Sequence, residues 1–162
     1  MPNHCYQQVS IKGPSKLVRQ LYAELKENGR FCDVVVPMPF ELWIAPDITS
    51  NKYGFETSSP QWYDWRYDNW DTKWDVCEVD VHGDLETDGD HPFDNDCTAW
   101  FNFNCWTAWG PPLNVWNKLV ALGVEVKADY QDECGQFEGM YSNGKNHSWE
   151  PEDEECEDEE EA

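Results

Sequence analysis

The chain has 162 residues with 33 acidic and 11 basic side chains, which gives a formal net charge of −22. A surface this negative repels nucleic acid and anionic membranes, so we expect cations or basic proteins as partners. With 40% hydrophobic and 15% aromatic residues, the chain is long and apolar enough to fold as one domain with its own core.

The N-terminal segment predicts a strand followed by a helix. Residues 1–4 lack the basic segment and apolar run of a secretory signal, and no stretch is apolar enough to span a membrane, so we expect a cytoplasmic protein. Residues 5–12 alternate between two faces, which is typical of a strand. After Gly13 and Pro14, Ser15 is a candidate cap for a helix with apolar side chains at steps of three and four, ending at Gly29.

Residues 31–75 show no regular periodicity. Prolines interrupt this segment, and ten aromatic side chains lie between Phe40 and Trp74. Because disordered segments are poor in aromatic residues, we expect a folded insertion that covers part of the core.

The second half of the chain predicts a hairpin, a helix and further strands. Residues 76–82 and 97–107 have strand-like patterns, and a turn region at residues 83–95 separates them. Residues 124–130 predict another strand, and residues 135–141 are a candidate for one more. Between them, a helix is expected from Pro111 and Pro112 to Gly123, with a buried side formed by Val115, Trp116, Leu119, Val120 and Leu122.

This order of elements predicts an α+β fold. The sequence β-α-β-β-α-β with an extra terminal strand is the split βαβ, or ferredoxin-like, arrangement. Right-handed crossovers would place both helices on one face of an antiparallel sheet and leave the other face open, covered or used. We therefore expect a ferredoxin-like domain over residues 1–148 with its insertion at 31–75, and an acidic, disordered tail over residues 149–162.

Five short motifs within residues 1–141 resemble those of the YubB/Api92-like proteins of phages and plasmids. They are residues 1–5 (MPNHC), 37–42 (PMPFEL), 69–75 (NWDTKWD), 107–112 (TAWGPP) and 133–139 (ECGQFEG). The resemblance implies a ferredoxin-like domain from a mobile element, acting in a host cytoplasm, and implies little about activity. Two features depart from the family pattern: Asp71 stands where the resemblance implies glycine, and the tail after Trp149 is an addition.

The cysteines and the acidic turn at residues 84–90 are candidates for metal binding. The seven cysteines form no C-x-x-C pair, so we expect reduced thiols rather than a disulfide framework or a zinc site at His4 or Cys5. Residues 84–90 resemble the first half of a calcium loop, but Asn95 stands where such a loop needs glutamate. The preferred interpretation of residues 84–90 is a solvated hairpin tip or an acidic contact surface, and calcium binding is the alternative. We expect no cofactor.

The sequence contains no nucleophile paired with a base and no phosphate-binding glycine loop, so we expect a binding protein rather than an enzyme. The alternative is a small-ligand binder or an enzyme that uses the Trp-rich motif, with Lys73 as a desolvated amine. A simpler interpretation is that Lys73 lies on the indole rings of Trp70 and Trp74 and pairs with Asp71 or Asp75.

One face of the predicted strand 97–107 carries Trp100, Asn102, Asn104 and Trp106. Such a face resembles the base-stacking surface of RNA-recognition domains, but the twelve acids between residues 64 and 96 have the wrong charge for a phosphate backbone. We expect aromatic side chains of the insertion to cover these tryptophans instead.

The acidic residues concentrate at residues 64–96 and in the tail, where residues 150–161 hold ten acids and no base. The tail alone is typical of a solubilising appendage. We interpret the two segments together as an imitation of nucleic-acid charge that fills a basic groove, with aromatic rings as anchors. The prediction is an inhibitor of a host DNA-binding defence protein, such as a nuclease or a CRISPR or restriction complex. The predicted contact residues are Asp64, Asp68, Asp71, Asp75, Glu78, Asp80, Asp84, Glu86, Asp88 and Asp90, with Trp62, Trp65 and Trp70 as anchors.

Overall fold

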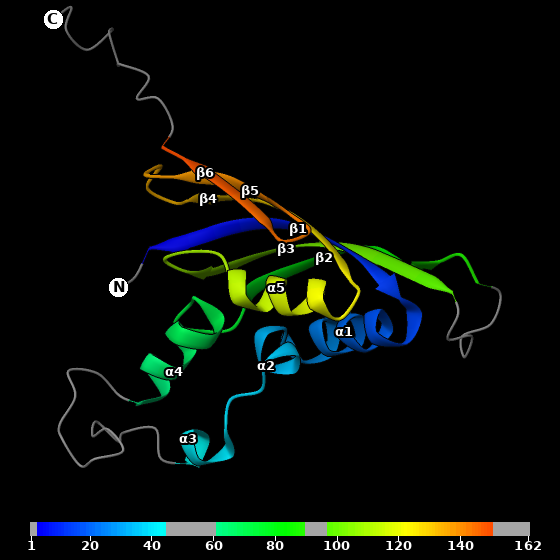
Figure 1. Cartoon of the computed structure of the whole chain (residues 1–162), viewed down its shortest axis with the longest axis horizontal. Helices are drawn as coiled ribbons and strands as arrows, with labels where there is room; N and C mark the ends of the chain where they lie inside the picture. Colours follow the sequence, from blue (N-terminus) through cyan, green and yellow to red (C-terminus); the bar gives the residue numbers. More distant parts are fainter. Residues whose placement is uncertain (1–2, 45–60, 90–96, 151–162) are drawn as a thin grey trace, which may run out of the picture.

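A computed structural model describes residues 3–44, 61–89 and 97–150 (Figure 1). Within these ranges, six strands form one antiparallel sheet in the order β2-β3-β1-β4-β5-β6. The strands are β1 (His4–Pro14), β2 (Cys77–Thr87), β3 (Thr98–Ala108), β4 (Glu125–Asp132), β5 (Glu138–Ser142) and β6 (Lys145–Trp149). The helices are α1 (Ser15–Asn28), α2 (Cys32–Val35), α3 (Phe40–Ile44), α4 (Gln61–Trp70) and α5 (Leu113–Ala121). The predicted α+β class and antiparallel sheet are confirmed.

Two crossovers organise the sheet. Strands β1 and β2 both pair antiparallel with β3, so they run parallel to each other, and α1 lies in the connection between them. Strands β3 and β4 both pair antiparallel with β1, and α5 connects them. Figure 1 shows α1 and α5 on the same face of the sheet, with α2 beside them. The opposite face of the sheet carries no helix of the described ranges.

Helix α1 forms as predicted, except at its beginning. Its apolar face buries Val18, Leu21 and Leu25 against the sheet, and it ends at Gly29, whose φ of 64° favours glycine. Ser15 is not the cap: it lies inside the first turn, where its hydroxyl accepts a hydrogen bond from Nε of Arg19 at 2.7 Å.

Helix α5 buries Val115, Trp116 and Leu119. The Trp116 ring lies 5.1 Å from the ring of Tyr141, which ties the helix to β5. The prediction that Leu122 is buried is wrong, because the helix ends at Ala121 and the Leu122 side chain is 47% exposed.

The predicted turn at residues 83–95 is too long, because β2 continues to Thr87. Its register against β3 shifts twice, between Cys77 and Asp80 and between His82 and Glu86. These irregularities let the strand stay paired past Gly83. Strand β6 was not predicted, since all five of its residues are exposed and no apolar alternation marks it.

Part of the insertion at residues 31–75 packs on the helix side of the sheet. Figure 1 shows α2 and α4 on the same side as α5, and α2 and α4 both contact α5. The expectation that the insertion covers Trp100 and Trp106 on the other face is therefore wrong for the described ranges. The exception is Trp74, whose ring lies 5.8 Å from that of His4, which in turn lies 5.5 Å from that of Trp106.

The core lies between the sheet and the helices. Side chains from alternate strand positions meet the apolar faces of α1 and α5. None of the helices in the described ranges is both long and apolar enough to cross a membrane. The main buried contributors from the strands are Val9, Ile11, Phe101, Phe103, Val126, Ala128 and Tyr130.

Candidate functional site

Helix α4 is built around the cation of its own Arg66. The guanidinium lies 5.1 Å from the ring centre of Trp43, 4.8 Å from that of Trp62 and 5.1 Å from that of Trp70. Burial lowers the pKa of Arg66, and the nearby carboxylate of Asp75 opposes this shift. Two of the three rings predicted to anchor a partner, those of Trp62 and Trp70, therefore already hold a cation within the fold.

Trp70 belongs to the core rather than to a contact surface. Its side chain is fully buried, and its indole N–H donates a hydrogen bond to the carbonyl of Val36 at 2.8 Å. The Trp65 ring packs 5.6 Å from it. The structure thus leaves Trp62 and Trp65, both half-buried, as the candidate anchors on α4.

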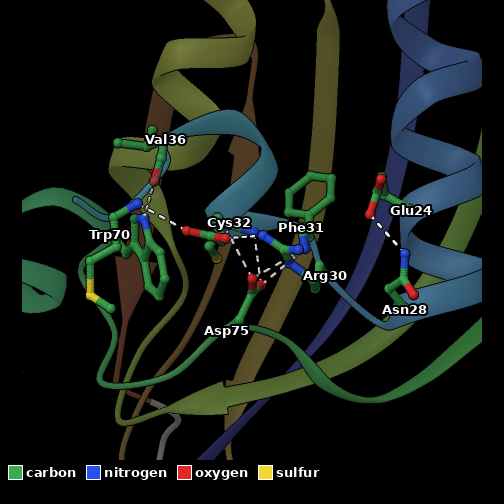
Figure 2. Close-up of polar contacts among 10 residues, drawn as sticks. Glu24, Asn28, Arg30, Phe31, Cys32, Val36, Trp70 and Asp75 are labelled. Carbon is green, nitrogen blue, oxygen red and sulfur yellow. Dashed lines mark hydrogen bonds and ion pairs between the residues drawn. The ribbon is translucent and has the colours of Figure 1, made fainter. Parts of the chain in front are cut away.

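Asp75 also serves the fold. Figure 2 shows its carboxylate pointing at the beginning of α2. It accepts hydrogen bonds from the backbone N–H groups of Phe31 at 3.1 Å, Cys32 at 2.7 Å, Asp33 at 3.0 Å and Val76 at 2.7 Å. A carboxylate that accepts four backbone hydrogen bonds has little acceptor capacity left for a partner. Asp75 is therefore not part of the contact surface.

Asp71 joins α4 to α5. Its carboxylate accepts a hydrogen bond from the backbone N–H of Asn114 at 2.8 Å, and burial raises the pKa of Asp71. Its backbone φ is 64°, a left-handed conformation that glycine adopts without strain and that aspartate tolerates. Asp64 and Asp68 have exposed side chains on the same helix.

Lys73 lies near aromatic rings but not in the predicted arrangement. Its ammonium is 5.9 Å from the ring centre of Trp74, as expected, and 5.6 Å from that of Tyr63. Within the described ranges, its amine forms no salt bridge with Asp71 or Asp75. The contact with Trp74 is confirmed, whereas the contact with Trp70 and the ion pair are not found.

Strand β2 and the residue that follows it carry a row of exposed acids. Strand β2 is an edge strand of the sheet, and its sequence contains no lysine or arginine. Glu86 accepts a hydrogen bond from the indole N–H of Trp100 at 2.7 Å, and Asp88, one residue past the strand, accepts one from the backbone N–H of Thr98 at 2.7 Å. Asp90 lies outside the described residues. The exposed acids of this surface, the acidic edge, are Glu78, Asp80, Asp84, Glu86 and Asp88.

The His, Cys, Asp and Glu side chains of the described ranges form neither a metal-binding cluster nor a reactive thiol at Cys5 or Cys32. No group of three or more His, Cys, Asp or Glu side chains there could hold a metal ion, and Asp84 and Glu86 of the suggested calcium loop lie in β2. Cys5, Cys32, Cys77, Cys105 and Cys134 are reduced thiols. Burial raises the pKa of Cys5 to about 12 and also raises the pKa of Cys32, so neither is a reactive thiolate at neutral pH.

The open face of the sheet is polar and hollowed. The strand registers place side chains in rows across it, and one row runs from Asp80 through Asn104, Gln8 and Asp129 to Met140. A hollow of about 540 Å³ lies over the centre of this face. The prediction that Trp100, Asn102, Asn104 and Trp106 share one face of β3 is confirmed by the burial pattern of that strand.

A second hollow of about 260 Å³ lies toward the β6 edge of the same face, and we name it the β6 pocket. Sequence reasoning missed it because β6 was not predicted and because its residues come from four separate strands. The only sequence signal was the position of Tyr6 and Asp129 on the polar sides of their strands. The lining residues are Tyr6, Gln8, Asp129, Tyr130, Gln131, Glu138, Gly139, Met140 and Trp149.

Comparisons with known proteins give one distant similarity. No family model matches the chain, and no curated protein matches it. The chain is similar to the crystal structure of a protein api92 from Yersinia pseudotuberculosis, assigned to family DUF1281, with 14% sequence identity and a TM-score of 0.42. The similarity covers 74% of this chain and 39% of that chain.

Proposed function

We propose that this protein binds a basic protein surface through the acidic edge. The observation that carries the proposal is the strand itself: Glu78, Asp80 and Glu86 are exposed on an edge strand that has no lysine or arginine. Its one histidine, His82, lies 4.0 Å from the carboxylate of Asp80. A rigid strand holds its carboxylates in fixed positions, so less conformational entropy is lost on binding than with a flexible acidic tail. Binding rather than catalysis is the activity that this surface supports.

The charge spacing supports a comparison with nucleic acid. Along a strand, each residue rises about 3.4 Å, so the five acids from Glu78 to Asp88 span about 34 Å and lie about 8.5 Å apart on average. A single strand of DNA carries one charge per about 3.4 Å of helix axis. The acidic edge thus has about 40% of the linear charge of one DNA strand by these spacings, and Asp64 and Asp68 on α4 add to it.

The class of partner follows from the charge and from the resemblance of the motifs. We assign the chain to the ferredoxin-like YubB/Api92-like proteins of mobile elements, supported by five motifs in order and by the two crossovers of the sheet. A phage or plasmid in a host cytoplasm gains an advantage by blocking defence proteins that bind DNA. These proteins bind DNA through basic grooves. The proposed function is therefore inhibition of such a nuclease or CRISPR or restriction complex by occupation of its DNA-binding groove.

The test is capture of basic proteins from a bacterial host lysate at low and at moderate salt, with and without duplex DNA. We expect captured proteins to be DNA-binding, to be released by DNA, and to be released steeply by salt, because exposed charge pairs are screened. The decisive variant neutralises the acidic edge as Glu78→Gln, Asp80→Asn, Asp84→Asn and Glu86→Gln.

The matched control neutralises the same number of acids in the C-terminal segment, as Glu152→Gln, Asp153→Asn, Glu154→Gln and Glu155→Gln. Loss of capture only in the edge variant, at a protein concentration where that variant sediments like the parent, supports the proposal. Capture that ignores DNA and salt, or that is lost only in the C-terminal variant, contradicts it.

A further inference from the structure

The β6 pocket combines aromatic walls with negative charge. Across β1, β4, β5 and β6, the strand registers align Tyr6, Gln131, Glu138 and Trp149 in one row, so the two aromatic side chains stand at its ends. All four line the pocket. The thioether of Met140, which is 54% exposed, lies in the adjacent row. Aromatic faces and a polarisable sulfur favour a flat, weakly hydrated group.

The carboxylates of the pocket come from Asp129 and Glu138. Asp129 pairs with Met140 and Gln131 pairs with Glu138, so the two acids are diagonal neighbours on adjacent strands. Such neighbours stand about 7 to 8 Å apart. This separation lets both carboxylates contact one planar cation that lies between them.

The acids of the pocket form no salt bridge within the described ranges. Glu138 accepts the indole N–H of Trp149 at 2.8 Å through Oε1, and no described cation pairs with either Glu138 or Asp129. None of the nine lining residues is lysine or arginine. The hydrogen bond to Glu138 also holds the Trp149 ring at the rim, where it is 38% exposed.

From this arrangement, we propose that the β6 pocket binds the guanidinium of an arginine side chain on the basic partner. Guanidinium is planar, stacks on aromatic rings and donates in a fork that suits carboxylates, whereas a lysine ammonium is compact and strongly hydrated. The volume of about 260 Å³ is below the usual range for small-molecule sites, and it suits a single side chain. This inference takes the class of partner, a basic protein, from the proposed function. It adds a second contact with that partner, at the β6 edge of the sheet rather than at the acidic edge.

The test uses N-acetyl-L-arginine amide as the probe, with the lysine and the neutral citrulline analogues as controls, at constant ionic strength. Binding is followed by the indole N–H resonance of Trp149 in ¹⁵N NMR spectra, assigned by its absence in Trp149→Phe. We expect the arginine probe to shift this resonance saturably and to bind at least about fivefold more tightly than either analogue.

Two variants, each of which removes one carboxylate, distinguish binding in the β6 pocket from attraction by the overall negative charge. Asp129→Asn is expected to weaken arginine binding by about fivefold, and Asp80→Asn, at the opposite edge of the same face, to leave it nearly unchanged. Equal effects of the two variants, or equal binding of arginine and citrulline, overturn the inference.

The outcome is independent of the capture experiment. If the protein binds arginine but captures no basic protein, the proposal for the pocket is supported and the proposed function is contradicted. If capture needs the acidic edge but not Asp129, the proposed function is supported and the proposal for the pocket is contradicted.

Discussion

Oδ1 of Asp75 lies 2.7 Å from the backbone nitrogen of Cys32, across 43 residues of sequence. The same carboxylate also accepts from Phe31, Asp33 and Val76, so one side chain fixes both the beginning of α2 and the loop before β2. The acidic residues of this chain therefore have two different roles, because some carboxylates stabilise the fold and others face solvent.

Replacing Asp75 separates these two roles. We expect Asp75→Ala to lower the free energy of unfolding by about 3 kcal/mol, because several backbone donors lose a charged acceptor. Urea denaturation of the purified protein measures this. Asp80→Ala, which removes the same charge from an exposed position, is expected to change stability by less than about 0.5 kcal/mol. A similar loss in both variants would show that the contacts to α2 are not what stabilises the fold.

A second prediction concerns Gly139 in β5. A Cβ atom at this position would lie 2.4 Å from Cζ of Tyr130, whose hydroxyl also donates to Asn146 at 2.6 Å. Because this ring is fixed from both sides, Gly139→Ala is expected to cost about 2 kcal/mol of stability, read from thermal and urea unfolding. Gly110→Ala is the control, since nothing lies within 4 Å of its Cβ. If both substitutions are equally tolerated, the close approach of Tyr130 is not a constraint.

Local patterns predicted the elements that have clear periodicity. Helix α1, helix α5 and strands β1, β3 and β4 follow from alternation or from steps of three and four, because each buries one regular face. Strand β6 gives no such signal, since its residues from Lys145 to Trp149 are all exposed and its pairing is decided by β5.

The candidate site was predicted only in part. The exposure of Asp80 and Glu86 follows from their polarity, but nothing local distinguishes them from Asp75, whose role depends on α2 reaching its carboxylate from 43 residues away. Similarly, Trp65 and Trp70 of α4 both stand between polar residues, and only the packed insertion shows that the indole of Trp70 is in the core. The β6 pocket needs four strands in register, which no sequence pattern supplies.

Asp71 predicts a pH-dependent effect. Burial raises the pKa of Asp71, so the folded state favours the protonated form, and ionisation of this group weakens stability as pH rises above the unfolded value of about 3.9. Asp71→Asn should therefore raise the free energy of unfolding at pH 7 by less than about 1 kcal/mol, since solvent screens a partly exposed group. The gain should vanish below about pH 3, where the carboxyl is protonated in both states.

The control for this effect is Asp68→Asn, which removes the same formal charge from an exposed position on α4. Denaturant titrations of both variants and the parent at pH 7 and pH 3 provide the comparison. A gain that is equal in the two variants would assign the effect to relief of the overall negative charge rather than to burial of Asp71.

We expect the acidic edge also to protect the sheet from self-association. Among residues 3–44, 61–89 and 97–150, strand β2 pairs with β3 on one side and with no strand on the other. An unpaired strand edge exposes N–H and C=O groups to another chain unless charge prevents it. Neutralising Glu78, Asp80, Asp84 and Glu86 to the matching amides should therefore produce larger species that grow with protein concentration, measured by sedimentation velocity. The C-terminal variant with four amides at residues 152–155 has the same net charge and should sediment like the parent. Growth in both variants would mean that total charge, and not the charge on β2, keeps the molecules apart.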